Sequence, residues 1–218
     1  MNKYIIYFLL LSISIEFSYS QSGSIELNSG GFSFVPIFTS DKPHMIFRGS
    51  TNNEKRLSLN LIHLIMLDGL TPSNYMLTVR YKIFDKNFKL WMGTELPGGY
   101  RVLKNEDYKS RNVHEIRSSY LINSETKLSF LYMHGQGRNF EMSNNFYAFY
   151  FQKNLKKITA TSQAYALYSS LLNEPMAGIA QKVSIRLKDK IILNLFINSS
   201  IAGEDYISNK TIGLEFFL

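Results

Sequence analysis

Histidines and serines are the residues of this chain that could carry out acid–base or nucleophilic chemistry. His134 precedes Gly135-Gln136-Gly137-Arg138, and Ser129 and Ser143 lie near it in the chain. A histidine that takes a proton from a serine hydroxyl is the minimum for acyl transfer, so an enzyme acting on membrane lipids is one alternative. Because the sequence provides no third group to orient the imidazole, an ordinary histidine at the rim of a scaffold is the simpler interpretation.

Other catalytic motifs are absent or incomplete. The chain contains neither G-x-S-x-G nor H-E-x-x-H, and Ser124-Glu125-Thr126-Lys127 matches S-x-x-K without its S-D-N and K-T-G partners. The other histidines, His44, His63 and His114, have no ligand spacing. The absence of cysteine excludes disulfides, thiolate metal sites and cysteine nucleophiles. We therefore expect no enzymatic activity, no metal and no cofactor.

Charged side chains offer a different chemistry, because they recur at alternate positions between apolar residues. For example, the apolar or aromatic residues Tyr75, Leu77 and Val79 occupy odd positions of one segment. The charged residues Arg80 and Lys82 occupy even positions of the same segment. In a strand such residues point to opposite faces, and charge in the middle of a lipid-facing surface would cost about 2–4 kcal/mol for each Arg or Lys. The charges that this pattern turns inward, toward a lumen, are Arg56, Arg80, Lys82, Lys89, Glu95, Glu115, Arg117, Lys182, Arg186 and Glu215.

Basic residues outnumber acidic ones in this set. A hydrated lumen lined in this way would favour small anions. The alternative is a closed interior in which the carboxylates clamp the arginines, and in which Trp91, Phe196 and Phe217 occupy the remaining space.

The elements that would position these charges are strands, since the hydrophobic period is two throughout the chain. Several of the segments have about ten residues, the length with which a tilted strand crosses a hydrocarbon core. We predict an all-β, up-and-down antiparallel transmembrane barrel of about twelve strands, with ten as the alternative. The predicted strands are 31–40, 43–49, 55–66, 74–84, 88–95, 112–122, 126–135, 144–153, 157–169, 177–187, 190–198 and 209–218.

Connections between these strands alternate in length from the second strand onward. The tight ones, such as 85–87 and 188–189, are rich in polar turn residues, whereas 96–111 is the longest of the others. Short periplasmic turns and longer outer loops are typical of outer-membrane barrels. The first connection, 41–42, is too short for an outer loop, so strands 31–40 and 43–49 are the least secure.

The first twenty residues have the features of a secretory signal peptide. Lys3 provides a positive charge, residues 4–15 are apolar, and Ser18 and Ser20 place small side chains before a cut between Ser20 and Gln21. Glu16 ends the apolar run too early for a spanning helix. We expect a signal peptide at 1–20, a periplasmic lead at 21–30 and a barrel at 31–218.

The C-terminal segment resembles the last strand of bacterial outer-membrane β-barrel proteins. Thr211, Gly213, Phe216 and Leu218 stand where that family has a polar residue, a glycine and two hydrophobic or aromatic residues. Leu218 departs from the terminal phenylalanine that the family prefers. The resemblance implies that the barrel-assembly machinery recognises this strand, which would be its C-terminal assembly signal. It also implies a location in the outer membrane of a Gram-negative-type bacterium, in contact with outer-membrane lipid.

Composition agrees with such a barrel. The chain is 45% hydrophobic and carries a formal charge of +7, and its mean hydropathy is −0.11. These values result when apolar and polar residues alternate around a closed sheet. Dispersed basic residues without a binding motif do not indicate nucleic acid. We expect a small passive, porin-like channel or a structural and surface-interaction protein. The alternatives are a lipid-modifying barrel enzyme and a secreted soluble β-sandwich that binds a carbohydrate or a protein.

Overall fold

Strands make up most of the described chain. The computed structural model describes residues 22–30, 42–51, 55–96, 99–102, 108–172, 174–203 and 210–218. None of these residues belongs to a helix long and apolar enough to cross a membrane. The strands are β1 (Ser22–Asn28), β2 (His44–Ser50), β3 (Leu57–Met66), β4 (Thr71–Asp85), β5 (Phe88–Glu95), β6 (Tyr100–Val102), β7 (Tyr108–Leu121), β8 (Thr126–Gly137), β9 (Ser143–Leu155), β10 (Ile158–Ser169), β11 (Met176–Lys188), β12 (Ile191–Ala202) and β13 (Lys210–Phe217).

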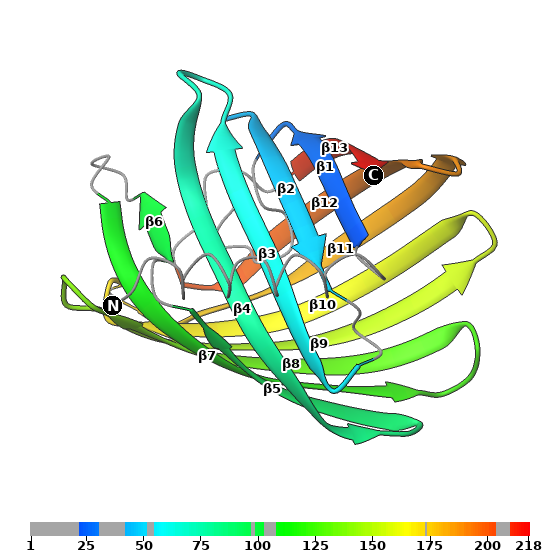
Figure 1. Ribbon diagram of the computed structural model, residues 1–218, viewed down its shortest axis with the longest axis horizontal. Helices are drawn as coiled ribbons and strands as arrows, with labels where there is room; N and C mark the ends of the chain where they lie inside the picture. Colours follow the sequence, from blue (N-terminus) through cyan, green and yellow to red (C-terminus); the bar gives the residue numbers. More distant parts are fainter. Residues whose placement is uncertain are drawn as a thin grey trace, which may run out of the picture.

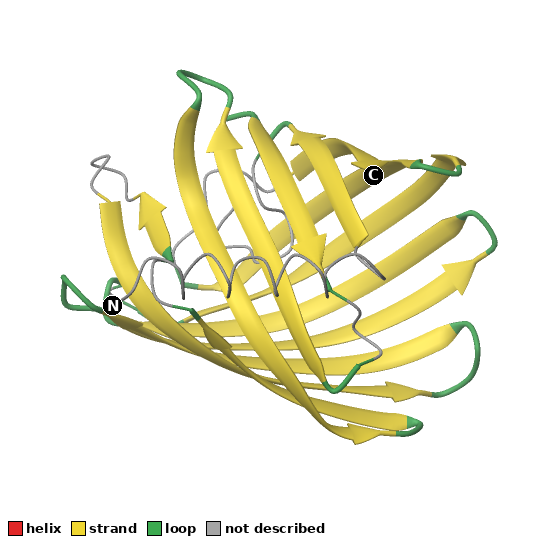
Figure 2. Cartoon of the chain, in the orientation of Figure 1, coloured by secondary structure: helices red, strands yellow, loops and turns green. Residues whose placement is uncertain are grey.

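These strands form one antiparallel sheet that closes into a barrel (Figure 1, Figure 2). Closure joins β1 to β13, with Ser24 opposite Phe217 and Asn28 opposite Gly213. The short strand β6 shares one position of the ring with β5, since both pair with β4 and β7. Thirteen strands in the described chain therefore occupy twelve positions, which confirms the predicted twelve-stranded barrel. The ten-stranded alternative and the two-sheet sandwich are wrong.

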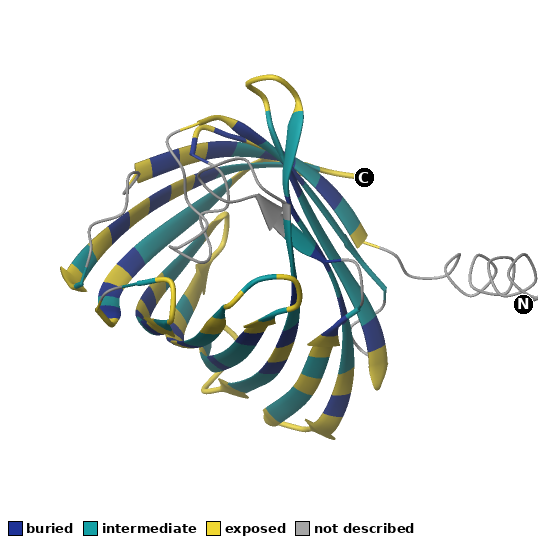
Figure 3. Cartoon of the chain, turned by 90° about the vertical axis from the view of Figure 1, so that its left-hand side faces the viewer, coloured by how far each residue is buried: buried dark blue, intermediate teal, exposed yellow. Residues whose placement is uncertain are grey.

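Alternation along each strand separates an interior face from an exterior face. In β9, Phe146, Ala148 and Tyr150 are buried inside the barrel, whereas Phe149 and Phe151 are 62% and 44% exposed. Figure 3 shows the same banding of buried and exposed residues on the neighbouring strands. The exterior positions carry mainly leucine, isoleucine and aromatic residues, so the outer surface suits a hydrocarbon environment.

The connections at one end of the barrel are mostly shorter than those at the other end, as predicted. The difference in length is less regular than the prediction. We call the end with residues 51–56, 86–87, 122–125, 156–157 and 189–190 the turn end, and the opposite end the loop end. Residues 67–70, at the loop end, form a tighter connection than residues 51–56. Gly69 and Leu70 permit this because both adopt positive φ angles, 74° and 50°.

The start of the barrel differs from the sequence prediction. Ser22–Asn28, assigned above to a periplasmic lead, is strand β1, which lies between β2 and β13. The predicted strand 31–40 lies outside the described residues. With β1 at 22–28, the connection to β2 spans 29–43, and the short first connection that broke the predicted pattern disappears.

The predicted long loop 96–111 is also partly wrong. Tyr100–Val102 forms β6, and Tyr108–Arg111 belongs to β7. Directly after β5, the Leu96 amide donates a hydrogen bond to the Leu77 carbonyl at 2.7 Å. The remainder of that segment, 97–98 and 103–107, lies outside the described residues.

Candidate pore lining

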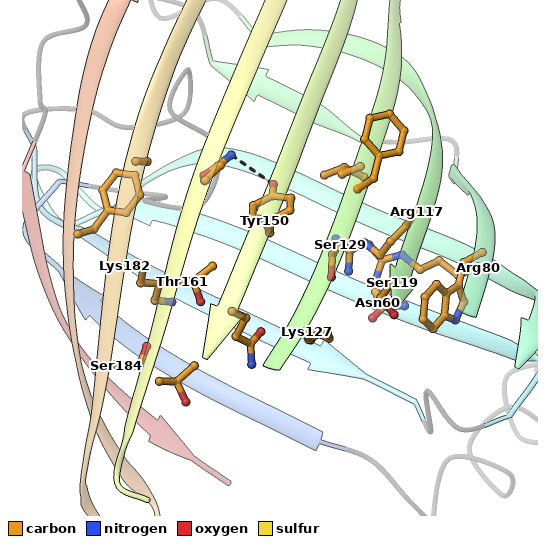
Figure 4. Close-up of a pocket in the computed structure, with 18 residues that line it drawn as sticks. Asn60, Arg80, Arg117, Ser119, Lys127, Ser129, Tyr150, Thr161, Lys182 and Ser184 are labelled. Atoms are coloured by element: carbon orange, nitrogen blue, oxygen red, sulfur yellow. Dashed lines mark hydrogen bonds between the residues drawn. The ribbon is translucent and has the colours of Figure 1, made fainter. Parts of the chain in front are cut away.

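A cavity of about 490 Å³ occupies the turn-end half of the barrel interior (Figure 4). Its wall includes Lys127, Gln152 and Thr159, which lie close to the turn end of β8, β9 and β10. Deeper in the barrel the wall includes Trp91 and Tyr150. Apart from the aromatic residues, most of these side chains are polar, and the cavity is therefore suited to water and a polar solute.

Three cations in the wall have no carboxylate partner. Arg117, Lys127 and Lys182 come from β7, β8 and β11, and they project toward the same space (Figure 4). Within the described part of the chain none of them forms an ion pair. A fourth cation of the wall, Arg80, is bound by Glu115 through its Nε, and its NH2 donates to Glu115 Oε2 at 3.3 Å. The net charge of the cavity wall is therefore positive.

A second cavity of about 330 Å³ lies beside the first. Asn60, Arg80, Arg117 and Lys182 line both of them, so the two spaces share one basic wall. The second cavity extends to Phe217 and to other residues at the turn end of β1, β2 and β13. The turn-end half of the lumen is thus a continuous polar region.

Carboxylates inside the barrel neutralise another group of cations near the closure of the sheet. Arg48 NH1 lies 2.7 Å from Glu26 Oε2 and 3.4 Å from Glu215 Oε1. Glu215 also accepts hydrogen bonds from Ser24 Oγ at 2.6 Å and from Asn194 Nδ2 at 3.0 Å. Since these residues come from β1, β2, β12 and β13, the cluster ties together the two ends of the described chain.

The remaining interior ion pairs lie on β4, β5 and β7. Asp85 contacts Lys82 Nζ at 3.0 Å and Lys89 Nζ at 3.4 Å. Glu95 lies 3.5 Å from Arg111, whose NH2 also donates to Asn74 Oδ1 at 2.8 Å. One of the two predicted interiors, in which carboxylates clamp cations, therefore describes these parts of the lumen. In the cavity wall it describes only Arg80, because Arg117, Lys127 and Lys182 form no ion pair within the described residues.

A cluster of apolar side chains lies in the loop-end half of the interior, beside the polar group of Asn74, Glu95 and Arg111. The apolar side chains lie on β2, β3 and β8–β11, and each has less than a tenth of its surface exposed. The barrel is therefore narrowed on the loop-end side of the basic cavity. This apolar collar consists of Ile46, Leu64, Leu131, Phe146, Ala148, Tyr150, Tyr165, Leu167 and Met176.

The predicted lumen residues fall into three groups. Arg80, Arg117 and Lys182 line the cavities, and Glu215 lines the second one. Lys82, Lys89, Glu95 and Glu115 lie on inward positions and form the ion pairs described above. Arg56 and Arg186 are exposed at the turn end, Arg56 in the bend before β3 and Arg186 near the end of β11.

Some interior charges of the described chain were missed by the sequence pattern, Asp85 among them. Glu26 was assigned to the lead, and Arg111 to a loop. Arg48 shares its face with His44 and Ile46, so polar and apolar residues do not separate on β2. The inward position of Lys127 could have been predicted, because Lys127 precedes the apolar Leu128 at the start of a predicted strand and therefore points to the opposite face.

The side chains considered for catalysis are not brought together. His134 lies on the exterior face of β8, where its Nδ1 lies 3.0 Å from Asn145 Oδ1. Ser129 is an odd number of residues away along β8 and lines the interior cavity, on the opposite face. Ser143 lies on the exterior face of β9 but pairs with Gln136 rather than His134. No group of three or more potential metal ligands occurs within the described residues.

The C-terminal motif lies at the seam of the barrel. Thr211 and Gly213 face the interior, whereas Phe216 and Leu218 lie on exterior positions. A side chain at position 213 would overlap the Glu26 carboxylate, so glycine is required here for packing against β1. The motif therefore has a structural role in closure, independent of any recognition by an assembly machinery.

Aromatic residues form belts on the exterior. Tyr132, Tyr147 and Tyr168 contact one another toward the loop end, with ring centroids 5.0 and 6.2 Å apart for successive pairs. Phe84 and Phe88 lie at the turn end with centroids 6.4 Å apart. Two such belts mark the interfaces of a transmembrane barrel.

Comparisons with known proteins agree with this geometry. No family model matches the chain, and no curated protein matches it. Among solved structures, the KdgM porin superposes with a TM-score of 0.65 at 10% identity, over 89% of this chain and 98% of that porin. The same porin in complex with disordered oligogalacturonate gives 0.63 at 10% identity, over 90% and 97% of the two chains.

Two other channels are similar. The NanC porin has a TM-score of 0.60 at 9% identity, over 91% of this chain and 98% of that one. An outer membrane channel from Pseudomonas putida F1 has a TM-score of 0.60 at 9% identity, over 91% and 94%. The chain has the fold of these outer-membrane β-barrel channels.

Proposed function

We propose that this barrel is a passive outer-membrane channel for small anionic solutes. The observation that carries the proposal is the interior cavity with the cations Arg117, Lys127 and Lys182, none of which forms an ion pair within the described chain. A cluster of like charge in a narrow lumen raises the local concentration of ions of the opposite sign. The channel folds of similar shape support a conducting role.

The solute class follows from the same charges. The KdgM porin, similar in fold, has been solved with oligogalacturonate, which is an acidic oligosaccharide. Serine, threonine and glutamine side chains accompany the cations in the cavity wall, and they can bind hydroxyl groups of a sugar. We therefore place small carboxylated solutes, including short acidic sugars, among the candidate cargo. The apolar collar would limit their size.

Single-channel recording tests this function. Purified protein in a planar bilayer should conduct and should prefer chloride to potassium, and added oligogalacturonate should block the current in brief events. A barrel that does not conduct would instead serve the structural or surface role. Substitutions of Arg80 and Lys82 would test ion preference less directly, because both residues have carboxylate partners.

A lipid-modifying enzyme receives less support. The His134 imidazole is hydrogen-bonded to an amide oxygen, and Ser129 lies on the other side of the sheet. We expect His134→Ala to leave both conductance and membrane-lipid composition unchanged.

Export to the outer membrane completes the proposal. The predicted cut before Gln21 would leave the mature chain beginning one residue before β1, so cleavage removes nothing from the barrel. The exterior apolar surface would contact outer-membrane lipid, and the barrel-assembly machinery would bind the C-terminal strand. The N-terminal sequence of the protein extracted from outer membranes should begin at Gln21.

A further inference from the structure

The exterior surface is hollowed across β5 and β7–β12, and β10 crosses the hollow. The hollow has a volume of about 760 Å³, and its wall is mainly apolar. Ser162 and Ala164 form its floor, while Phe149 of β9 and Ile179 of β11 stand on either side. Small side chains between larger ones thus create a groove on the surface that faces the membrane.

A row of small residues on β10 crosses this groove. Between Ile158 and Tyr168, the exterior positions of β10 are Ala160, Ser162, Ala164 and Ala166, and a larger exterior residue lies opposite each of them on β9 or β11. Ser162 Oγ lies 2.6 Å from Gln181 Oε1, at the middle of both strands. The mainly apolar groove therefore contains polar atoms midway along these strands.

A basic cluster lies at the turn end of the same strands. The β9–β10 and β11–β12 turns are adjacent, since the Arg186 amide donates to the Lys157 carbonyl at 2.8 Å. The side chains of this cluster are exposed, and none forms an ion pair within the described residues. The only acidic residue in the two turns is Asp189, and Glu125 lies in the next turn. The cluster consists of Lys153, Lys156, Lys157, Arg186, Lys188 and Lys190.

The spacing between groove and cluster matches one leaflet of a bilayer. Lys153 follows Phe151 on the same exterior face of β9, about 7 Å along the strand. From Ser162 to Lys157 the chain covers about 17 Å, or about 12 Å along the membrane normal for a strand tilted by about 45°. Half of the hydrocarbon core is about 15 Å thick, so the cations lie at the depth of lipid headgroups.

We propose that the groove and the basic cluster together bind an anionic phospholipid. Its acyl chains lie along β10 between Phe149 and Ile179, and its phosphate contacts Lys153 and Lys157. Charge complementarity identifies the occupant, because Phe151 in the wall of the apolar groove lies two residues from Lys153, a member of a group of cations that form no ion pair within the described residues. A second copy of this chain fits less well, since a concave face presents no ridge to fill an identical hollow. The site is independent of solute passage through the lumen.

Native mass spectrometry of the full mature protein in detergent tests the site. Phosphatidylglycerol should be retained at least fivefold more than phosphatidylethanolamine with the same acyl chains. Lys153→Gln with Lys157→Gln should reduce phosphatidylglycerol retention to the level of phosphatidylethanolamine. The matched control, Lys55→Gln with Arg56→Gln, removes two exposed cations from the β2–β3 turn and should retain the lipid as the wild type does.

A separate substitution tests whether the groove holds the acyl chains. Ala164→Phe fills the floor and should reduce retention of both lipids, whereas Ala177→Phe, on the exterior face outside the groove lining, should not. Ala164→Leu serves if the phenylalanine variant fails to show heat-modifiable migration. The proposal is overturned if the lysine or groove variants behave like their controls, if inorganic phosphate displaces the lipid equally well, or if the groove variants abolish a dimer.

Discussion

Replacing Arg117, Lys127 and Lys182 together by glutamine should remove most of the channel's preference for anions. A sphere with the volume of the cavity, about 490 Å³, has a radius of about 5 Å, so a solute at its centre lies about 7 Å from a charged nitrogen in the wall. At this separation one unit charge contributes about 0.6 kcal/mol in water, and about half of that remains at 0.1 M ionic strength.

The effect on ion selectivity follows from the summed interaction energy of the three charges. Three charges contribute about 0.9 kcal/mol, favourable for an anion and unfavourable for a cation, so their loss should lower the anion-to-cation permeability ratio about 20-fold. At 1 M salt the Debye length is about 3 Å, and the same substitutions should change the ratio only about twofold. The strong dependence on salt distinguishes an electrostatic effect from a change in pore size.

The assay is the reversal potential in a planar bilayer under a potassium chloride gradient, at both salt concentrations. Lys55→Gln, Lys86→Gln and Lys210→Gln together remove the same charge from exposed positions and should leave the reversal potential unchanged. Heat-modifiable migration establishes that each variant is folded. If the cavity variant and this control have the same reversal potential at 0.1 M salt, the assignment of the three cations to the conduction path is refuted.

Three further substitutions test the interior. Leu131→Ala, in the apolar collar, should lower the free energy of unfolding by about 2–5 kcal/mol and raise single-channel conductance; an unchanged conductance in the folded variant would contradict a constriction there. Arg48→Gln leaves the Glu26 and Glu215 carboxylates without their cation and should cost about 3–5 kcal/mol in denaturant titrations, with partial recovery in Arg48→Lys. Gly213→Ala should reduce the folded fraction after refolding, because the added methyl overlaps the Glu26 carboxylate; wild-type refolding yield would disprove that packing role.

Much of the fold could be predicted because the relevant signal is local. A period of two along the chain identifies a strand and its two faces without knowledge of the partner strand. The predicted segment 88–95 coincides with β5, and Arg80 and Lys82 lie on the inward face as the alternation requires. The strand Ser22–Asn28 escaped detection because it is short and precedes two glycines.

Pairing between distant residues escaped prediction for a different reason. Ser24 and Glu215 are 191 positions apart, and their hydrogen bond exists only because β1 and β13 meet when the barrel closes. In the same way, only the folded structure shows that Glu115 forms an ion pair with Arg80 and not with Arg117. Alternation places all three charges inside but contains no information about which of them will be neighbours.

The amino-acid sequence by itself determined a closed antiparallel barrel with a basic interior and an apolar exterior, since those properties depend on residue type and on a repeat of two. Only the tertiary structure decided which cations remain unpaired in the cavity, where the apolar collar narrows the lumen, and that an exterior groove crosses β10 near a cluster of basic residues. These features depend on register, because hydrogen bonding between strands sets which side chains share one height in the barrel.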